Sequence, residues 1–391
     1  MMLLALVLAV LLVGSIMYCV LTLCAAWRYL SVETPVASSL PPITIMKPLA
    51  GLDDGLAENL RSFFDQDYPK FEILLAVSDR DDPAARVARR VMREFPAISS
   101  KLAIAGQSPA PNAKVFSLSR MFAMAQHEIV VMADSDTRVE QGFLKAIAAE
   151  MSDRKVGLVT CPYRAVSGDS LWSRLEALGL NTEFLAGVLV ARMLIGMDFA
   201  LGPVIAVRRN LLDRIGGLGR LQNYLAEDFV MGNLVAAAGH RVVLSSYKIE
   251  HRIGAQNLRA NFEHRLRWAR STRRSRPLGY IGQIFTNPVP LALLLLLIAP
   301  TWYLLAVAAL VFRAITAWVM AAGVLRKPLP FSHWLLMPAQ DLISCITWLS
   351  GFFGQTIKWR GRRYNVRSDG TFGVAKSEPG LPELSDSVTY S

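Results

Sequence analysis

The stretch Ile129-Val130-Val131-Met132-Ala133-Asp134-Ser135-Asp136 is the part of this sequence that decides the fold. Five consecutive apolar residues are typical of a buried parallel strand, and in open α/β sheets ligands bind beyond the carboxyl ends of such strands. Two carboxylates on alternate residues there can hold a hard divalent cation, which neutralises a diphosphate. An acidic turn after a strand is the alternative interpretation, because Asp-x-Asp alone is common.

The chain between residues 41 and 255 alternates strand-like and helix-like stretches. Strands are expected at 43–46, 71–77, 102–105 and 156–160, and helices at 56–64 and 83–95. Alternation of this kind predicts an α/β fold, with a mostly parallel sheet that helices cover on both faces.

The first 28 residues predict a transmembrane anchor. No charged residue precedes Arg28, and about 20 apolar residues suffice to cross a bilayer core. A cleaved signal peptide would need a basic start and a small-residue cleavage site, and neither is clear here. We therefore expect a retained anchor over 1–28, with Arg28 on the cytoplasmic side.

A second membrane region is expected at 278–325, as two spans separated at Pro300. Residues 334–357 are a further candidate span, although it contains Asp341, and Arg313 falls inside the second span of the pair. Ionisable groups at such depth face protein or water. Three spans would place the basic run at 358–363 outside, against the positive-inside rule, so the number of crossings stays open. The tail, 358–391, is expected to be basic and then disordered.

Composition excludes some classes of protein. The chain is 53% hydrophobic with a net charge of +11, and its Lys and Arg residues concentrate beside the membrane segments. Attraction to anionic lipid accounts for that placement, so no nucleic-acid partner is predicted. The four cysteines form no close pair and are interpreted as small apolar residues in a reducing compartment.

Polar residues follow the predicted strands. Asp79 comes after strand 71–77, and Asp82 suits the N-cap of the next helix. Lys114 opens a helix, where it would either meet a phosphate or lie in a solvated first turn. Glu227 and Asp228 begin another helix. Both can complement its dipole, or one can act as a general base that deprotonates an acceptor hydroxyl.

Two other segments allow two interpretations each. The apolar stretch 180–209 fits either an acceptor-side wall or a core helix followed by a strand. The basic helix expected at 256–277 places Arg267 on one face with Glu263, and Trp268 with His264. Such a helix is suited to the membrane surface, and Arg267 is also suited to a pyrophosphate.

Taken in order, these blocks resemble the membrane-bound inverting glycosyltransferases of families 2 and 21, the group that includes ceramide glucosyltransferase. The matching blocks are 47–51, 63–69, 78–83, 112–114, the Asp134 triplet, 156–159, 226–229 and 267–268. The resemblance covers most of the chain. It implies a GT-A-type, Rossmann-like catalytic domain over 41–255, with transmembrane helices at both ends.

The family signature implies roles for four acidic residues. Its first aspartate falls on Asp79, which is implied to contact the nucleoside. The second falls on Asp134, on the donor side, with Asp136 as the ligand of Mg²⁺ or Mn²⁺. The third falls on Asp228, the implied catalytic base. Lys114 lies in one of the matching blocks and is a further candidate for donor binding.

The signature ends in Gln/Arg-x-x-Arg-Trp. Arg267 and Trp268 match the final pair and are implied to bind the donor. His264 stands where the family has Gln or Arg. This departure leaves the role of His264 open, as that of Glu227 is.

The resemblance implies transfer of a sugar from a UDP-sugar to the hydroxyl of a membrane lipid, with inversion. The chain is also similar to hopanoid-biosynthesis glycosyltransferases, which implies N-acetylglucosamine as the sugar and bacteriohopanetetrol as the acceptor. A ceramide glucosyltransferase using UDP-glucose is the alternative. A processive polysaccharide synthase and a catalytically inactive sugar-nucleotide sensor are further alternatives. The expected location is a bacterial inner membrane, with the catalytic domain in the cytoplasm.

Overall fold

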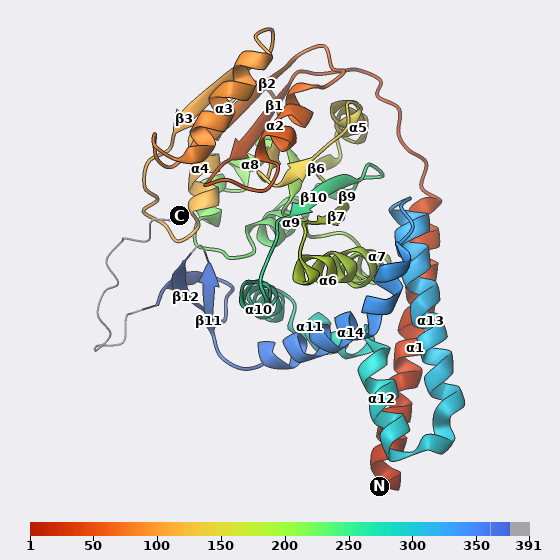
Figure 1. The fold of residues 1–391 in the computed structure, drawn as a ribbon. Coiled ribbons are helices and arrows are strands. Elements are labelled where there is room, and N and C mark those ends of the chain that lie inside the picture. The colour runs from red at the N-terminus through yellow and green to blue at the C-terminus, as the bar shows by residue number, and fades with distance from the viewer. Residues whose placement is uncertain (360, 376–391) are drawn as a thin grey trace, which may run out of the picture.

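A seven-stranded sheet lies at the centre of the computed structural model, which describes residues 1–359 and 361–375 (Figure 1). The strand order is β3-β2-β1-β4-β8-β6-β9, and β8 alone runs against the others. The predicted, mostly parallel sheet is therefore confirmed. The strands are β1 Ile43–Pro48, β2 Phe71–Val77, β3 Ser99–Ile104, β4 Ile129–Ala133, β6 Val156–Thr160, β8 Val204–Arg208 and β9 Arg241–Leu244.

Helices cover both faces of this sheet, as predicted. Alternate residues of a strand point to opposite faces, so Ile45 and Met46 of β1 belong to different cores. The helices against the face of Ile45 are α2 Leu56–Phe64, α3 Pro83–Glu94 and α5 Phe143–Glu150. Those against the face of Met46 are α4 Ala113–Phe122, α8 Arg209–Arg214 and α9 Glu227–Ala237, with the short 3₁₀-helix η2 Leu218–Leu221.

A second, three-stranded sheet lies beside the end of β4. It consists of β5 Thr137–Arg138, β10 Ile249–Ile253 and β7 Tyr163–Ser167, in the order β5-β10-β7. Since β5 follows the acidic triplet directly, its pairing with β10 places His251 opposite Thr137. A residue more than one hundred positions along the chain thus reaches the triplet.

The segment 180–209 folds as a helix followed by a strand, which was one of its two predicted forms. Helix α6 Leu171–Gly179, the π-helix η1 Leu180–Phe184 and α7 Leu185–Ile195 run on from one another, and β8 follows. A π-helical turn often marks a functional site. Here η1 turns Thr182 and Glu183 toward the helices that follow the catalytic domain.

Three helices form a bundle that projects from the catalytic domain: α1 Met2–Leu30, α12 Pro288–Ile298 and α13 Tyr303–Trp318 (Figure 1). In the described residues, three helical stretches are long and apolar enough to cross a membrane: Met2–Leu30, Leu171–Ile195 and Pro300–Val324. A fourth exists if the pair Pro277–Phe285 and Pro288–Ile298, bent by 52°, counts as one span. These stretches also contain α11 Pro277–Gly282, η3 Gln283–Phe285, η4 Pro300–Trp302 and η5 Val319–Val324.

The structure differs from the prediction at the candidate span 334–357. Its helix, α14 Phe331–Gly351, does not meet the same criteria for a span, and it runs beneath the catalytic domain beside α10 Leu258–Ser275 (Figure 1). Asp341 is fully buried and pairs with Arg313, with Nη2 and Oδ1 2.8 Å apart. Gln340, also buried, accepts a hydrogen bond from Arg265 of α10. The polar face of α14 therefore meets protein and not lipid.

The structure also differs at the predicted tail, 358–391. Residues 356–374 contain an antiparallel sheet of β11 Thr356–Trp359, β12 Arg362–Val366 and β13 Phe372–Val374. Apolar residues of these strands, on either side of the basic run, are buried against Leu225. They are Ile357, Tyr364, Val366 and Phe372. The part expected to be disordered, from Ser377 onward, lies outside the described residues.

Candidate active site

The turn after β4 is fixed by a buried lysine of the neighbouring strand. Lys47 Nζ donates to the carbonyl oxygen of Asp134 at 2.6 Å and to Thr137 Oγ1 at 3.1 Å. Burial lowers the pKa of Lys47 to about 7, although the nearby carboxylates oppose that decrease. Ser135 Oγ donates to Asp53 on the other side of the turn. The backbone of the triplet is thus held in place, and its two carboxylates meet different partners.

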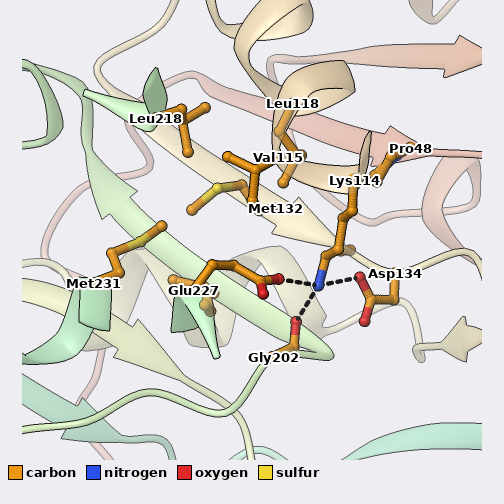
Figure 2. A pocket seen from close by; sticks show the side chains of 12 residues that line it. Pro48, Lys114, Val115, Leu118, Met132, Asp134, Gly202, Leu218, Glu227 and Met231 are labelled. Carbon is orange, nitrogen blue, oxygen red and sulfur yellow. Dashed lines mark hydrogen bonds and ion pairs between the residues drawn. The ribbon is translucent and has the colours of Figure 1, made fainter. Parts of the chain in front are cut away.

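The first carboxylate belongs to an ion-pair cluster around Lys114 (Figure 2). Lys114 Nζ lies 2.7 Å from Asp134 Oδ1 and 3.0 Å from Glu227 Oε1, and it donates to the carbonyl oxygen of Gly202 at 3.5 Å. Burial disfavours the ammonium, but the two carboxylates outweigh it and raise its pKa. Lys114 therefore acts as the cation that joins β4, α4, α9 and the loop before β8. The predicted phosphate contact stays a prediction.

The two acids at the start of α9 differ in their surroundings. Glu227 is paired with Lys114 and also accepts a hydrogen bond from the buried amide of Asn112 at 3.2 Å. Asp228 forms no ion pair within the described part of the chain, and its Oδ1 accepts from the Phe229 amide at 2.8 Å. Burial, and then the charge of Glu227, raise the pKa of Asp228 to about 7. Asp228 is therefore the carboxylate better suited to accept a proton near neutral pH.

The second carboxylate of the triplet faces His251. Asp136 Oδ1 and His251 Nδ1 are 3.4 Å apart, and both atoms are buried without a hydrogen-bond partner. Burial opposes both charges, yet their attraction lowers the pKa of Asp136 and raises that of His251. Among the residues that the structure describes, no group of three or more His, Cys, Asp or Glu side chains is arranged so that it could hold a metal ion. A carboxylate is the ligand that Mg²⁺ and Mn²⁺ prefer, and the imidazole would ligate a cation only in its neutral form, with phosphate and water as the other ligands.

Trp268 is connected to this pair through a row of rings. His251 contacts Tyr163 with centroids 5.4 Å apart, Tyr163 stacks on Phe184 at 5.5 Å, and Phe184 contacts Trp268 at 6.1 Å. The rings come from the second sheet, from η1 and from α10. The Arg-Trp motif and the acidic triplet are thus two ends of one packed layer.

The other two residues of the motif have partners of their own. His264 Nδ1 lies 2.7 Å from Glu176, a buried carboxylate of α6, and its ring lies 4.9 Å from that of Trp268. The residue that departs from the family pattern therefore fixes α10 to α6. The Arg267 guanidinium lies over the ring of Trp359 in β11, 5.6 Å from its centroid.

Asp79 stands apart from these residues. It is exposed just beyond β2, and its Oδ1 accepts from the Asp81 amide at 2.9 Å. Asp82 caps α3, as expected, by accepting from the Ala84 amide. Strands β2 and β4 are parallel and β1 lies between them. Asp79 and Asp134 therefore follow strands that end at the same edge of the sheet, two strands apart. Its contact with a nucleoside stays a prediction.

Sequence reasoning missed several residues of the site. Lys47 was visible as a charge within an apolar strand, which signals a buried partner. Asn112 occupies an N-cap position, and this explains its side-chain bond to the Val115 amide but not its bond to Glu227. His251 and Glu176 carried no local signal, since their partners are far away in the sequence.

The fold and the site define a class. A mostly parallel sheet with an Asp-x-Asp turn at its carboxyl edge, and an acidic helix start facing that turn, is the architecture of a GT-A glycosyltransferase. The sequence profile of glycosyl transferase family 21 matches residues 6–372. The chain belongs to glycosyl transferase family 21.

Named relatives and a solved structure agree with this assignment. Ceramide glucosyltransferase 3 of Caenorhabditis elegans is 28% identical over 240 residues, 60% of this chain and 51% of the relative. Ceramide glucosyltransferase of Komagataella phaffii is 34% identical over 115 residues, 28% of this chain and 22% of the relative. The chain thus spans about half the length of these relatives, or less. The mannosyltransferase PcManGT from Pyrobaculum calidifontis, solved with GDP-Man and Mn²⁺, has a similar fold. Its TM-score is 0.50 at 20% identity, over 88% of this chain and 99% of that one.

Proposed function

We propose that this protein transfers glucose from UDP-glucose to the primary hydroxyl of ceramide or of a closely similar membrane lipid, with inversion. The observation that carries the proposal is the position of Asp228. This carboxylate lacks an ion pair within residues 1–359 and 361–375, and it stands beside the Lys114 cluster at the sheet edge where a donor would bind. The named relatives, all ceramide glucosyltransferases, favour ceramide as the acceptor. The apolar bundle beside the catalytic domain suits a lipid substrate.

In the proposed reaction Asp228 is the general base. Its raised pKa makes it a useful proton acceptor near neutral pH, and such catalysis is typically worth about 10²–10⁴-fold in rate. The lipid oxygen bonds to the anomeric carbon, the bond from that carbon to the diphosphate oxygen breaks, and the hydroxyl proton passes to Asp228. UDP leaves on the opposite face, and the configuration at the anomeric carbon inverts.

We propose that Asp136 and His251 hold a divalent cation, Mg²⁺ or Mn²⁺. When bound, the cation would neutralise charge on the diphosphate. Lys114 keeps the Asp134 carboxylate next to this cation site, and Lys47 holds the backbone carbonyl of Asp134 in place. Asp79 would contact the nucleoside. Arg267 and Trp268 would close the donor site from α10, with Arg267 suited to the diphosphate because of its planar guanidinium.

The other substrates predicted from the sequence stay predictions. Transfer of N-acetylglucosamine to bacteriohopanetetrol uses the same chemistry, because that acceptor is also an amphiphile with a primary hydroxyl. A bacterial inner membrane, with the catalytic domain in the cytoplasm, remains the expected location.

A matrix of donors and acceptors tests the proposal. The purified full chain in lipid nanodiscs is given UDP-glucose or UDP-N-acetylglucosamine with ceramide or bacteriohopanetetrol, and products are identified by mass spectrometry. Monoglucosylceramide is the expected product, and the Asp228→Asn variant is the control for background. If product formed with bacteriohopanetetrol and not with ceramide, the result would favour the hopanoid acceptor instead. Oligosaccharide would indicate a processive synthase, and donor binding without any product would indicate a sensor.

A further inference from the structure

One loop lies pressed against the first turns of α9, directly in front of Asp228. This loop, residues 196–203, joins α7 to β8. A Cβ on Gly232 of α9 would lie 2.4 Å from Phe199 Cα, so only glycine permits this approach of the two backbones. Asn233 Nδ2 donates to the Asp198 carbonyl at 2.6 Å, and a Cβ on Gly202 would lie 3.0 Å from Asp228 Oδ2. The loop and the base are thus in immediate contact.

The loop and α9 together form an aromatic wall next to the base. The ring of Phe199 stacks on that of Phe229 with centroids 6.3 Å apart, and Phe229 directly follows Asp228 in the sequence. Arg276, between α10 and α11, covers this wall. Its guanidinium carbon lies 4.3 Å from the Phe199 centroid and 5.4 Å from that of Phe229. With Arg276 in this position, Phe199 is only 6% exposed.

Arg276 is held there by a single exposed carboxylate. Its Nη2 lies 3.0 Å from Asp198 Oδ1, and the Asp198 side chain is 51% exposed. An ion pair whose carboxylate is open to solvent contributes little, so displacing the guanidinium costs mainly its contacts with the two rings. The pair also offers several free N–H donors and one carboxylate acceptor at the outer end of the wall.

Exposed apolar side chains flank the two residues of this pair in the sequence. Leu194 and Ile195, at the end of α7, come just before Asp198 in the sequence and are 60% and 64% exposed. Leu278 and Ile281, in α11, follow Arg276 and are 83% and 55% exposed. Exposed apolar groups around a polar centre are typical of a binding site for an amphiphile or a membrane surface.

We propose that the lipid acceptor binds between this wall and Arg276, a role that rests on the proposed function. The reactive hydroxyl would reach Asp228, and the first carbons of the chain would replace the guanidinium on the rings of Phe199 and Phe229. The displaced Arg276, with Asp198, would bind the remaining polar groups of the head, and the chain would leave past Leu278 toward the membrane.

The charges at this site select a class of head group. Asp198 and Asp228 are both acidic, so a phosphorylated head beside the Arg276 guanidinium would also meet two carboxylates. A neutral head that carries both hydroxyl and carbonyl groups can use the donor and the acceptor of the Arg276–Asp198 pair together. The site therefore takes an uncharged amphiphile and excludes anionic lipids.

Substitutions of the pair test this site. In Arg276→Gln we expect the KM for a short-chain ceramide to rise about tenfold or more, with the Kd for UDP-glucose unchanged within about twofold. Arg274→Gln removes the same charge two residues earlier and is the matched control, with an unchanged acceptor KM. In Asp198→Asn, ceramide 1-phosphate becomes a better inhibitor, with its Ki about tenfold lower than for the wild type.

Direct binding separates this inference from the proposed function. Binding of a fluorescent short-chain ceramide to the full chain in nanodiscs weakens in Arg276→Gln and in Phe199→Leu, even if no transfer is detected. Transfer that proceeds with the same acceptor KM in both variants would overturn the acceptor site while leaving the proposed function intact. Fluorescent ceramide bound equally by wild type and both variants would overturn it as well.

Discussion

The ammonium of Lys114 is the cation on which the acidic site depends, so its removal gives the sharpest test of the structure. The Lys114 side chain is 19% exposed, and those of its partners Asp134 and Glu227 are 27% and 11% exposed. Lys114→Met keeps most of the apolar part of the side chain and removes the ammonium group. Breaking a buried pair by removal of one partner costs about 3–5 kcal/mol. Because all three groups retain some exposure, we expect a loss of about 3 kcal/mol at pH 8.

The pH dependence of this loss has a definite sign. Burial raises the pKa of Asp134 above that of the unfolded chain, and Lys114 opposes the increase. Without Lys114 the folded-state pKa rises further. A carboxylate with a raised folded pKa destabilises the fold above its unfolded pKa, and this cost disappears as the pH falls and both states become protonated. The deficit of Lys114→Met should therefore shrink from pH 8 toward pH 4.

Chemical denaturation of the protein in nanodiscs, followed by tryptophan fluorescence, measures the loss. Lys155→Met removes an exposed lysine and serves as the control. Equal stability of the two variants at pH 8 would refute the role of Lys114 as the counter-ion. A deficit that does not change between pH 8 and pH 4 would refute its electrostatic origin.

Four further predictions concern the base, the cation and the C-terminal sheet. Asp228→Asn should lower transfer by about 10²–10⁴-fold while UDP binding, measured by calorimetry, survives; a folded variant that no longer binds UDP would count against the base. Because only ionised Asp228 accepts a proton and its pKa is raised to about 7, kcat/KM of the wild type should fall as the pH is lowered through 7. A flat profile from pH 5 to 8 would contradict this. His251→Ala should weaken Mn²⁺ binding, detected by electron paramagnetic resonance, by about tenfold or more, and unchanged affinity would exclude His251 as a ligand. Phe372, 1% exposed, anchors the C-terminal sheet beside residues 223–225. Phe372→Ala should cost that sheet about 3–5 kcal/mol and increase hydrogen exchange at 223–226, whereas unchanged exchange would show that the sheet does not hold this loop.

Much of the catalytic domain could be read from the sequence, because its signals are local. The apolar run before Asp134 and the Pro at the start of α3 act over one or two turns of chain, and the strands and helices that were expected appear within a few residues of their expected bounds. The π-helical turn of η1 and the reversed direction of β8 carry no such local signal, and neither was predicted.

The apolar segments after the catalytic domain were harder to read. Charged and amide side chains inside an apolar stretch leave its interpretation open until their partners are known. α14 does not meet the length and hydropathy criteria for a span, and its Asp341 and Gln340 are buried against the distant residues Arg313 and Arg265. The strands of the C-terminal sheet were also hard to recognise, because basic residues stand among their apolar ones. The apolar face of this sheet is buried only because Leu225 packs against it.

The sequence by itself determined the strand end and the helix start at which the candidate acids stand, since Asp134 and Asp136 follow a strand and Glu227 and Asp228 open a helix that local periodicity reveals. Only the tertiary structure decided what each carboxylate does. Glu227 and Asp228 are adjacent and chemically alike, yet Glu227 pairs with Lys114 and accepts a hydrogen bond from Asn112, while burial and the charge of Glu227 raise the pKa of Asp228 to about 7. The physical reason is that ionisation depends on charges within a few ångströms, and folding brings those charges from residues that are far apart along the chain.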